Sequence, residues 1–230
     1  MKIAKRNFHE TSREYVYRVI TDNIISLDLM PGSLVSENEI AKLLGVSRTP
    51  VREAFIQLSK LKLMEIIPQK GSRISLIDYN LVDEANFMRC ALEMAVVEAA
   101  CNNYDKLNYD KINENIALQK YYFEKDNPEK LFELDDCFHK LLFELCQKNQ
   151  CYYLLKEMTA HFDRVRNMSL YMVKDINIYY EHKLLLEAIK CGDREKSLKI
   201  ISDHLEKFKI HGDKLVKIFP DFFKKNQLGG

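Results

Sequence analysis

Four side chains in the second half of the chain have the types and spacings of a metal site: Asp135, His139, His182 and His204. The first two are four positions apart, so on one helix they share a face on consecutive turns. The other two lie at nearly equal distances on either side of a predicted helix-ending turn at Cys191-Gly192-Asp193. In an antiparallel hairpin both then sit about 15 Å from that turn, at the same level. Three imidazoles and a carboxylate suit Zn²⁺, Ni²⁺, Co²⁺ or Mn²⁺, with Zn²⁺ or Ni²⁺ favoured, and open positions leave room for a carboxylate ligand.

The same residues leave other interpretations open. Each histidine taken singly is explained by an ordinary hydrogen bond in a helical core. A bound ion can be purely structural, in which case it stabilises the fold and senses nothing. The ion can itself be the signal, which would make the protein a metal sensor. A site with an open position can also activate water, but no general-base motif accompanies these residues, so we expect no enzyme.

Three further side chains are candidates for binding the carboxylate of an effector: Arg89, Asn149 and Arg164. Arg89 can form a fork with a carboxylate or an internal ion pair with Glu93, one helical turn on. Asn149 is expected to end the helix that carries the metal pair, where capping competes with lining a pocket. Arg164 and Arg166 occupy the middle of the following helix, where we expect one to face the cavity and the other the solvent. His161 shares that helix and is a lesser candidate ligand.

The elements that must position these residues are helices. After Asp78, glycine and proline nearly vanish, and stretches with helical periodicity follow one another without competing strand alternation. Helices joined by short turns lie antiparallel, so the sequence predicts an all-helical bundle. The predicted helices span 80–102, 109–125, 128–147, 150–172, 175–191 and 193–217.

A second group of residues near the N-terminus has the pattern of a helix-turn-helix. Ser36 and Glu39 form a predicted capping box that begins a short helix with Ile40, Ala41, Leu43 and Leu44 as its apolar side, and Gly45 ends it. Ser47 can cap the next helix, whose core stripe is Val51, Ala54, Leu58 and Leu61.

The start of that second helix carries side chains suited to DNA. Arg48 and Arg52 project about a quarter turn from the core stripe, so they can point outward. Arginine reads guanine O6 and N7 in the major groove, and Thr49 can contact a base edge or a thymine methyl. The amides at the helix start, beside Ser47, can hold a phosphate.

A predicted hairpin follows this helix. Residues 62–68 and 73–76 are typical of two short strands, and residues 69–72 of the turn between them. This is a wing, and Lys70 and Arg73 at or beside its tip are placed to approach phosphates or a minor groove.

Residues 15–76 resemble the winged helix-turn-helix of the GntR family of bacterial transcription regulators. The resemblance rests on Met30-Pro31-Gly32-Ser33-Leu34, on Ser36-Glu37, on the run from Leu44 to Ala54 and on the wing glycine. It implies DNA contacts by Arg48, Thr49, Arg52 and Gly71. Many members carry an arginine where this chain has Asn38, so the contact made there is weaker or the operator differs.

Residues 80–217 resemble the FCD effector-binding domain of the FadR subfamily within the same family. The resemblance rests on Arg89-Cys90-Ala91-Leu92-Glu93, on the run from Asp135 to His139, on Asn149, on Glu181-His182 continuing to Ala188-Ile189, on Gly192-Asp193 and on His204. In metal-containing members of that subfamily an aspartate and three histidines hold the ion. All four positions are matched here, and none is missing.

Length and charge agree with this organisation. A chain of 230 residues with 47% hydrophobic residues exceeds one domain of about 100–150 residues. Residues 1–78 hold 12 Lys or Arg against 9 Asp or Glu, a net +3, while the rest of the chain has −2. This modest excess predicts a homodimer that pairs two half-sites of a palindromic operator. The predicted parts are a DNA-binding domain at 1–76, a short linker at 77–80, a helical metal- and effector-binding domain at 81–220 and a tail at 221–230.

Two further features bear on location. No apolar run approaches ~20 residues and the N-terminus has no hydrophobic signal region, so we expect a cytoplasmic protein without membrane contact. Six cysteines without paired CxxC spacing are expected to be mostly buried small hydrophobes. Taken together, the sequence predicts a mostly α-helical regulator whose binding to double-stranded operator DNA is controlled by a small carboxylate effector at the metal, and the resemblance implies that it is a repressor.

Overall fold

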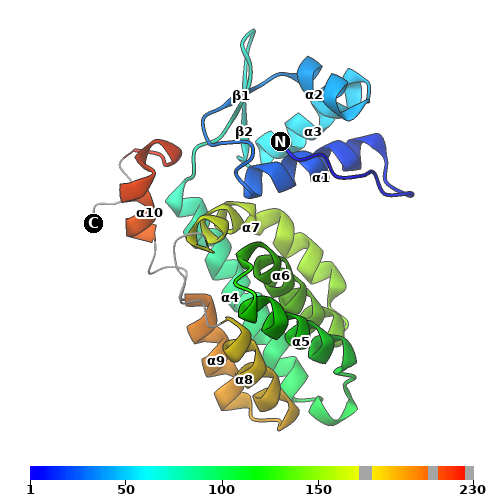
Figure 1. The fold of residues 1–230 in the computed structure, drawn as a ribbon, viewed down its shortest axis with the longest axis vertical. Coiled ribbons are helices and arrows are strands. Elements are labelled where there is room, and N and C mark those ends of the chain that lie inside the picture. Colours follow the sequence, from blue (N-terminus) through cyan, green and yellow to red (C-terminus); the bar gives the residue numbers. More distant parts are fainter. Residues whose placement is uncertain (171–177, 207–211, 226–230) are drawn as a thin grey trace. The chain divides into compact units, whose positions relative to one another are not determined.

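The computed structural model describes residues 1–170, 178–206 and 212–225, and the chain divides into two compact units (Figure 1). Unit 1 comprises Met1–Asp83, Ala160–Val165 and Asp213–Gly230. Unit 2 comprises Glu84–Thr159 and Arg166–Gly212. Within the described ranges, no helix has the length and apolar character needed to cross a membrane.

Unit 1 contains the predicted winged helix-turn-helix. Three strands form an antiparallel sheet in the order β1-β3-β2, with Arg73 of β3 opposite Leu34 on one side and Glu65 on the other. Figure 1 shows the hairpin of β2 and β3 as the extended part of this unit. The elements are α1 (Ser12–Ile25), β1 (Leu34–Val35), α2 (Glu37–Leu44), α3 (Arg48–Lys60), β2 (Met64–Ile67) and β3 (Gly71–Ile74).

The helix ends of unit 1 differ in part from the sequence prediction. Ser36 is the N-cap of α2, but its side chain makes no capping hydrogen bond, so the predicted capping box is wrong. A complete box stands instead at the start of α1, where Thr11 and Glu14 each bond the other's backbone amide. Gly45 ends α2 with φ of 65°, a left-handed conformation that glycine adopts without a Cβ penalty.

The core of unit 1 lies between α1, α3 and the sheet. Val51, Ala54 and Leu58 of the predicted stripe are buried, and Phe55 joins them, while Leu61 is only partly buried. In α2, Leu43 is exposed, contrary to the predicted apolar side. The α1 side of the core is Val16, Val19, Ile20 and Ile24.

Unit 2 is built from helices, as predicted. The first five predicted spans agree with the observed helices to within three residues at every end that the structure describes, whereas the predicted end at 172 and start at 175 lie outside the described residues. The helices are α4 (Tyr79–Cys101, which begins in unit 1), α5 (Asp110–Glu124), α6 (Pro128–Leu145), α7 (Asn149–Leu170), α8 (Ile178–Lys190) and α9 (Arg194–Glu206), with a short 3-10 turn, η1 (Tyr104–Lys106), before α5.

The boundaries between the predicted parts need correction. The predicted linker 77–80 is not a separate segment, because α4 begins at Tyr79 and Ile77 forms a parallel bridge with Phe223. The predicted helix 193–217 is observed over α9 (Arg194–Glu206) and α10 (Gly212–Ile218), and residues 207–211 between them lie outside the described residues. A short 3-10 turn, η3 (Pro220–Phe222), precedes the buried Phe223.

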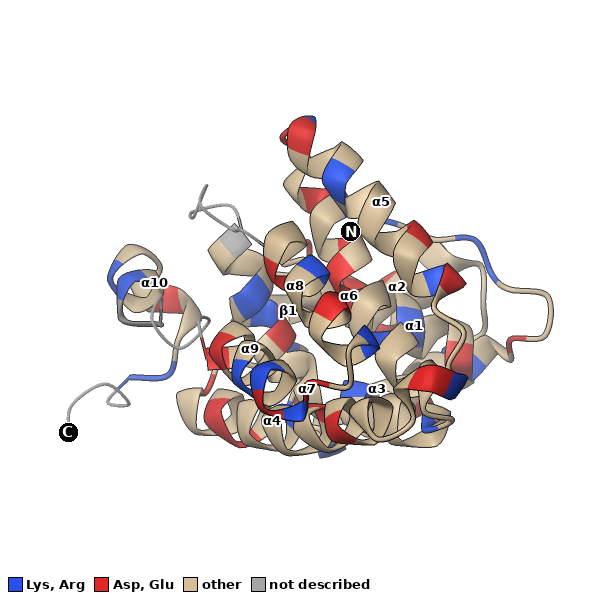
Figure 2. Cartoon of the chain, turned by 90° about the horizontal axis from the view of Figure 1, so that it is seen from below, with Lys and Arg blue, Asp and Glu red and all other residues tan. Residues whose placement is uncertain are grey.

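The α8–α9 hairpin forms as the sequence predicted. Gly192 adopts a φ of 67° in the turn, and a Cβ at this position would lie 2.8 Å from the ring of Tyr104. The side chain of Asp193 accepts a hydrogen bond from the amide of Lys196 at 3.1 Å and caps α9. Figure 2 shows basic and acidic positions interspersed along both helices. The turn and its cap therefore fix the relative level of side chains on α8 and α9.

The cysteines are less buried than expected. Cys101 alone is fully buried among the six, which all lie in the described ranges, whereas Cys137 and Cys191 are exposed. No disulfide joins any two of them.

Candidate metal centre and DNA-binding surface

The start of α3 presents the predicted DNA-binding side chains to solvent. Ser47 is the N-cap of the helix, and its side chain makes no capping hydrogen bond. Arg48, Thr49 and Arg52 are exposed, because the buried stripe of α3 faces the opposite side. The guanidinium of Arg48 lies 3.6 Å from the carboxylate of Glu37, an exposed pair that water screens strongly. These side chains are therefore available to a groove of DNA.

The wing presents the remaining predicted residues. Lys70 and Gly71 are exposed at the turn between β2 and β3, and Gly71 has φ of 98°, where a residue with a side chain is strained. Arg73 is exposed and lies 3.6 Å from Glu65 on the neighbouring strand. The sheet thus holds a basic residue on each side of a glycine turn, a geometry suited to phosphate contacts.

Unit 2 brings the four candidate ligands together. Asp135 and His139 extend from α6, His182 from α8 and His204 from α9, and their ligand atoms all lie within 4.8 Å of one another. Asp135 Oδ1 is 3.6 Å from His139 Nε2, 3.4 Å from His182 Nε2 and 3.8 Å from His204 Nε2. All four side chains are buried. The level predicted from the α8–α9 turn is therefore observed.

These distances fit a divalent transition metal. Ligands bound at about 2.1 Å to a tetrahedral ion are separated by about 3.4 Å, close to the observed spacings. Two of the ligand atoms, Asp135 Oδ1 and His182 Nε2, are buried without a hydrogen-bond partner in the described part of the chain. A buried polar atom without a partner is costly, and a cation at their common centre would satisfy both.

Each of the four ligands is also held through an atom that it does not offer to the centre. His182 Nδ1 is 2.9 Å from Gln119 Oε1, and His204 Nδ1 is 2.8 Å from Glu181 Oε2. His139 Nδ1 lies 2.6 Å from Glu93 Oε2, although the ring is not aligned for a linear hydrogen bond. Asp135 Oδ2 lies 3.2 Å from the Arg166 guanidinium. Such outer partners orient metal ligands and set the histidine tautomer.

The surrounding charges keep the carboxylates ionised. Burial by itself would raise the pKa of Asp135, but the Arg166 guanidinium and the nearby imidazoles outweigh it and hold the pKa well below its ordinary value. Burial opposes ionisation of Glu93 in the same way, and Arg89 and His139 nevertheless lower its pKa to about 2. The candidate ligand Asp135 is therefore negatively charged at neutral pH.

The imidazoles divide by environment. Burial lowers the pKa of His182 well below its ordinary value, and it also lowers that of His204 despite the opposing hydrogen bond to Glu181. Burial acts in the same direction on His139, but the adjacent Glu93 carboxylate outweighs it and raises the pKa. Neutral rings at His182 and His204 are the form that coordinates a metal.

The arginines are arranged differently from the prediction. Arg89 Nε pairs with Glu93 at 2.7 Å, the internal ion pair that was one of its two interpretations. Arg164 and Arg166 are both fully buried, so the expectation that one faces solvent is wrong. They lie two positions apart on a helix and so diverge by about 200°. Arg166 contacts Asp135 of the candidate metal cluster, whereas Arg164 belongs to unit 1 and donates to the Ser75 carbonyl at 2.8 Å.

Two other predicted positions also lie elsewhere. Asn149 is exposed at the first residue of α7 rather than at the end of α6, so its side chain does not line the buried cluster. His161 belongs to unit 1, where Nε2 lies 2.9 Å from the Leu61 carbonyl, and burial lowers its pKa to about 4. The outer partners Gln119, Glu181 and Arg166 were not identified from sequence.

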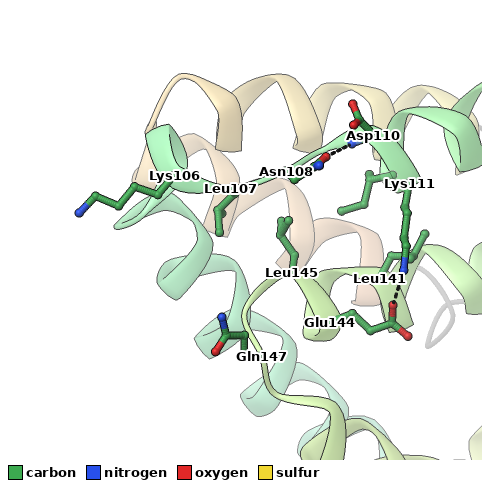
Figure 3. A pocket seen from close by; sticks show the side chains of 10 residues that line it. Lys106, Leu107, Asn108, Asp110, Lys111, Leu141, Glu144, Leu145 and Gln147 are labelled. Carbon is green, nitrogen blue, oxygen red and sulfur yellow. Dashed lines mark hydrogen bonds and ion pairs between the residues drawn. The ribbon is translucent and has the colours of Figure 1, made fainter.

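A separate hollow of about 560 Å³ lies beside α5 and α6 (Figure 3). Leu107, Leu141 and Leu145 supply its apolar wall, and Lys111 pairs with Glu144 at 3.9 Å. None of the four candidate ligands is among the residues that line it. The hollow is therefore distinct from the metal cluster.

Comparison with known proteins agrees with both units. Residues 12–74 match the family model of bacterial regulatory proteins of the gntR family, and residues 84–207 match the FCD domain. A repressor named RspR from Escherichia coli K12 is 30% identical over 194 residues, which cover 84% of this chain and 85% of that protein. The chain belongs to the GntR family. Members bind operator DNA and typically dimerise, so this GntR protein is a DNA-binding transcription regulator.

Other relatives agree with this assignment of the GntR protein. An uncharacterised HTH-type transcriptional regulator in an unstable DNA locus of Streptomyces ambofaciens is 30% identical over 214 residues, or 89% of each chain. The solved structure of E. coli McbR/YncC superposes with a TM-score of 0.73 at 20% identity and covers 91% of this chain and 99% of that one. The likeness to McbR/YncC shows that the two proteins share a fold.

Proposed function

We propose that this GntR regulator is a repressor whose operator binding is controlled by a small organic acid at the metal cluster of unit 2. The observation that carries the proposal is the buried set of three Nε2 atoms around Asp135 Oδ1, two of whose atoms have no hydrogen-bond partner among the described residues. FCD domains commonly bind metal, and the donor set fits Zn²⁺ or Ni²⁺.

The cluster is suited to an anionic ligand. A bound divalent ion would supply a Lewis-acidic centre for a carboxylate oxygen. Arg89 and Arg166 contribute two buried positive charges next to the ligands, although each is already paired with an acidic side chain. Of the three predicted effector residues, Arg89 remains a proposed contact through its guanidinium, whereas the positions of Asn149 and Arg164 do not support that role.

The exposed basic residues of unit 1 support the proposal of a dimer in which each protomer contacts one operator half-site. Exposed Arg48, Thr49 and Arg52 at the start of α3, with Ser47 at its N-cap, are proposed to contact the major groove. Lys70, Gly71 and Arg73 of the wing are proposed to contact phosphates or the minor groove. With a net charge of only +3 over residues 1–78, one unit is a weak electrostatic binder, so a homodimer on a palindromic operator would supply the rest of the affinity.

The proposal is tested by elemental analysis of the purified protein, followed by a thermal-shift screen of hydroxy acids, sugar acids and short carboxylates. We expect about one divalent transition metal per chain and a rise in the unfolding temperature with at least one acid. Both should vanish in His139→Gln and persist in His9→Gln, which alters an exposed histidine outside the cluster. Metal-free protein after purification in metal-supplemented buffer would contradict the proposal.

The other roles of the metal give different outcomes in the same experiment. If the ion alone is the signal, chelation changes operator affinity with no acid present. If the ion is purely structural, its removal lowers the unfolding temperature while no acid alters operator affinity. Consumption of an acid by the metal-loaded protein would indicate an enzyme.

A further inference from the structure

Two buried amide side chains on α5 are hydrogen-bonded to the candidate metal cluster, although neither of them is a candidate ligand. Asn115 has an exposed fraction of 4% and Gln119 of 0%. They lie one helical turn apart, and Gln119 Nε2 donates to Asn115 Oδ1 at 2.6 Å. Asn115 Nδ2 donates to the backbone carbonyl of Leu134 at 3.1 Å, and Gln119 Oε1 lies 2.9 Å from His182 Nδ1. The chain of contacts therefore runs from the backbone of α6 to an imidazole of α8.

The backbone carbonyl of Leu134 fixes the direction of every hydrogen bond in this series of contacts. A backbone carbonyl can only accept, so the Asn115 atom that faces Leu134 must be the amide nitrogen. The oxygen of Asn115 then faces Gln119 and requires a donor, which is the Gln119 amide nitrogen. The remaining Gln119 oxygen faces His182 and requires an N–H at Nδ1. His182 must therefore carry its proton on Nδ1 and leave Nε2 as a bare lone pair.

That lone pair faces the centre of the cluster. His182 Nε2 is 3.4 Å from Asp135 Oδ1. Asp135 directly follows Leu134, whose carbonyl accepts the hydrogen bond from Asn115. With a lone pair on one side and a carboxylate on the other, neither atom can donate to the other. A cation between them resolves the conflict, so the tautomer imposed by the amides is the one that a metal needs.

We propose that Asn115 and Gln119 are positioning residues that set the tautomer of His182 before any metal is bound. The inference rests on the metal site of the proposed function. It separates His182 from the other two imidazoles, whose outer partners Glu93 and Glu181 are carboxylates. An ionised carboxylate accepts through either oxygen, so it needs no orientation, whereas an amide accepts only when its oxygen faces the ring. Asn115 supplies that orientation for Gln119.

The choice of an amide also affects charge. A carboxylate at position 119 would accept from His182 equally well and would add a fourth negative charge to a cluster that already holds Asp135, Glu93 and Glu181. Gln119 fixes the ring without that charge. The hydrogen-bonded pair of Asn115 and Gln119, which we call the relay, therefore orients His182 while leaving the metal cluster more favourable to an anionic ligand.

The tautomer can be measured in metal-free protein by long-range ¹H–¹⁵N correlation of ¹⁵N-histidine-labelled samples at pH 8, where an ordinary imidazole is neutral. His182→Asn identifies the resonances of this ring. We expect the wild type to show a protonated Nδ1 and an unprotonated Nε2 at His182. A wild-type ring protonated on Nε2 would overturn the proposal without the need for any variant.

The relay itself is tested by substitution. Gln119→Leu removes the acceptor, and we expect the Nε2–H form to appear and the affinity for Zn²⁺ alone to fall about 10- to 100-fold in competition with a chelating dye. Gln119→Glu restores an acceptor, so we expect the Nδ1–H tautomer to be retained. Asn113→Leu is the matched control, because Asn113 is an exposed amide on the same helix whose partner is Lys190.

The outcomes separate the relay from the metal site. An unchanged His182 tautomer in folded Gln119→Leu overturns the relay even if zinc still binds. If Gln119→Leu does not fold, Gln119→Glu and the wild-type tautomer decide the question. Failure of zinc to bind the wild type with the Nδ1–H tautomer present would contradict the proposed function and leave the tautomer assignment supported.

Discussion

The exposed surface at the start of α3 and on the wing of unit 1, and the candidate metal cluster of unit 2, use their arginines in opposite ways. At the start of α3 and on the wing, Arg48, Arg52 and Arg73 are exposed and make at most long ion pairs with neighbouring acids. In unit 2, Arg166 is fully buried and contacts two aspartates, one of which is a candidate metal ligand. In the first arrangement the guanidinium groups are accessible to a partner molecule. In the second the guanidinium group holds two aspartate side chains in place.

The two arrangements have different consequences for stability. Unit 1 has an apolar core behind its exposed basic residues, so the side chains proposed to contact DNA can be changed at little cost to the fold. The polar residues of unit 2 lie inside the bundle, where loss of one partner leaves another buried and unsatisfied. Function and stability are separable in unit 1 and joined in unit 2.

The largest expected effect comes from breaking the buried ion pair. Arg166→Met removes the guanidinium that lies against Asp135 and Asp136 and over the ring of Phe132. Because the buried carboxylate of Asp135 loses its counter-charge, while the partly exposed Asp136 keeps its pair with Lys156 at 2.7 Å, we expect the free energy of unfolding to fall by about 3–5 kcal/mol. The measurement is urea denaturation of the metal-free protein.

The matched control for that variant is Arg73→Ala, which removes an exposed pair with Glu65. Its expected cost is about 0–1 kcal/mol. Equal losses in the two variants would contradict the contrast between the units.

The next effect is stabilisation by metal. Binding of an ion to the folded state alone should raise the free energy of unfolding by about 2.7 kcal/mol when free Zn²⁺ is at 100 times its dissociation constant. We expect the gain in the wild type and its loss in Asp135→Asn, measured by thermal unfolding at controlled free zinc. A variant that gained as much as the wild type would remove Asp135 from the ligand set.

Substitutions of the exposed arginines of α3 should weaken operator binding and leave the fold intact. Arg48→Ala and Arg52→Ala are each expected to weaken operator binding by about 1–3 kcal/mol per lost base contact. Fluorescence anisotropy on a duplex selected from a random pool measures the affinity. Lys60→Ala alters an exposed cation at the other end of α3 and serves as the control. An affinity loss as large in that variant would indicate general charge loss rather than base reading.

The smallest effect is a pH dependence that belongs to unit 2. The folded-state pKa values of His182 and His204 are lowered. In metal-free protein at mildly acidic pH, these imidazoles therefore bind protons more readily in the unfolded chain than in the folded one. Their contribution to stability is fully present above the unfolded pKa of about 6.5 and is lost progressively as the pH falls from there to the lowered folded-state pKa. His139 has a raised pKa and acts in the opposite sense.

The pH effect is measured by denaturation of metal-free protein at pH 7.5 and 5.5. We expect His182→Gln to show a loss about 1.4 kcal/mol smaller than that of the wild type, the value for one histidine over one pH unit. Parallel losses in the two proteins would mean that His182 titrates normally in the fold.

The contrast also explains how much the sequence could predict. The exposed arginines of α3 follow from one helical stripe, because Val51, Ala54 and Leu58 define the buried side. Asp135 with His139, and His182 with His204, follow from helical spacing and from a turn whose glycine is recognisable. These local rules relate residues that are close in sequence or symmetric about one turn.

The outer partners of the metal ligands obey no such rule. Nothing in the spacing of Gln119 indicates that it meets His182, because the two residues lie on helices whose packing depends on the whole bundle. Glu93 had a partial signal through its i,i+4 relation to Arg89. Arg164 and Arg166 are both buried, so periodicity could not distinguish which of them reaches the cluster, and the interpretation favoured the wrong one.

In the proposed mechanism, an acid held at the histidine cluster controls a DNA surface built from other residues. The most direct test of this mechanism is operator affinity, measured by anisotropy with and without the best acid from the thermal-shift screen, in zinc-loaded wild type and in His182→Gln. We predict that the acid weakens operator binding at least tenfold in the wild type, a coupling of about 1.4 kcal/mol, and has no effect in the variant. Operator affinity that the acid leaves unchanged in zinc-loaded wild type, or alters equally in both proteins, would contradict the account.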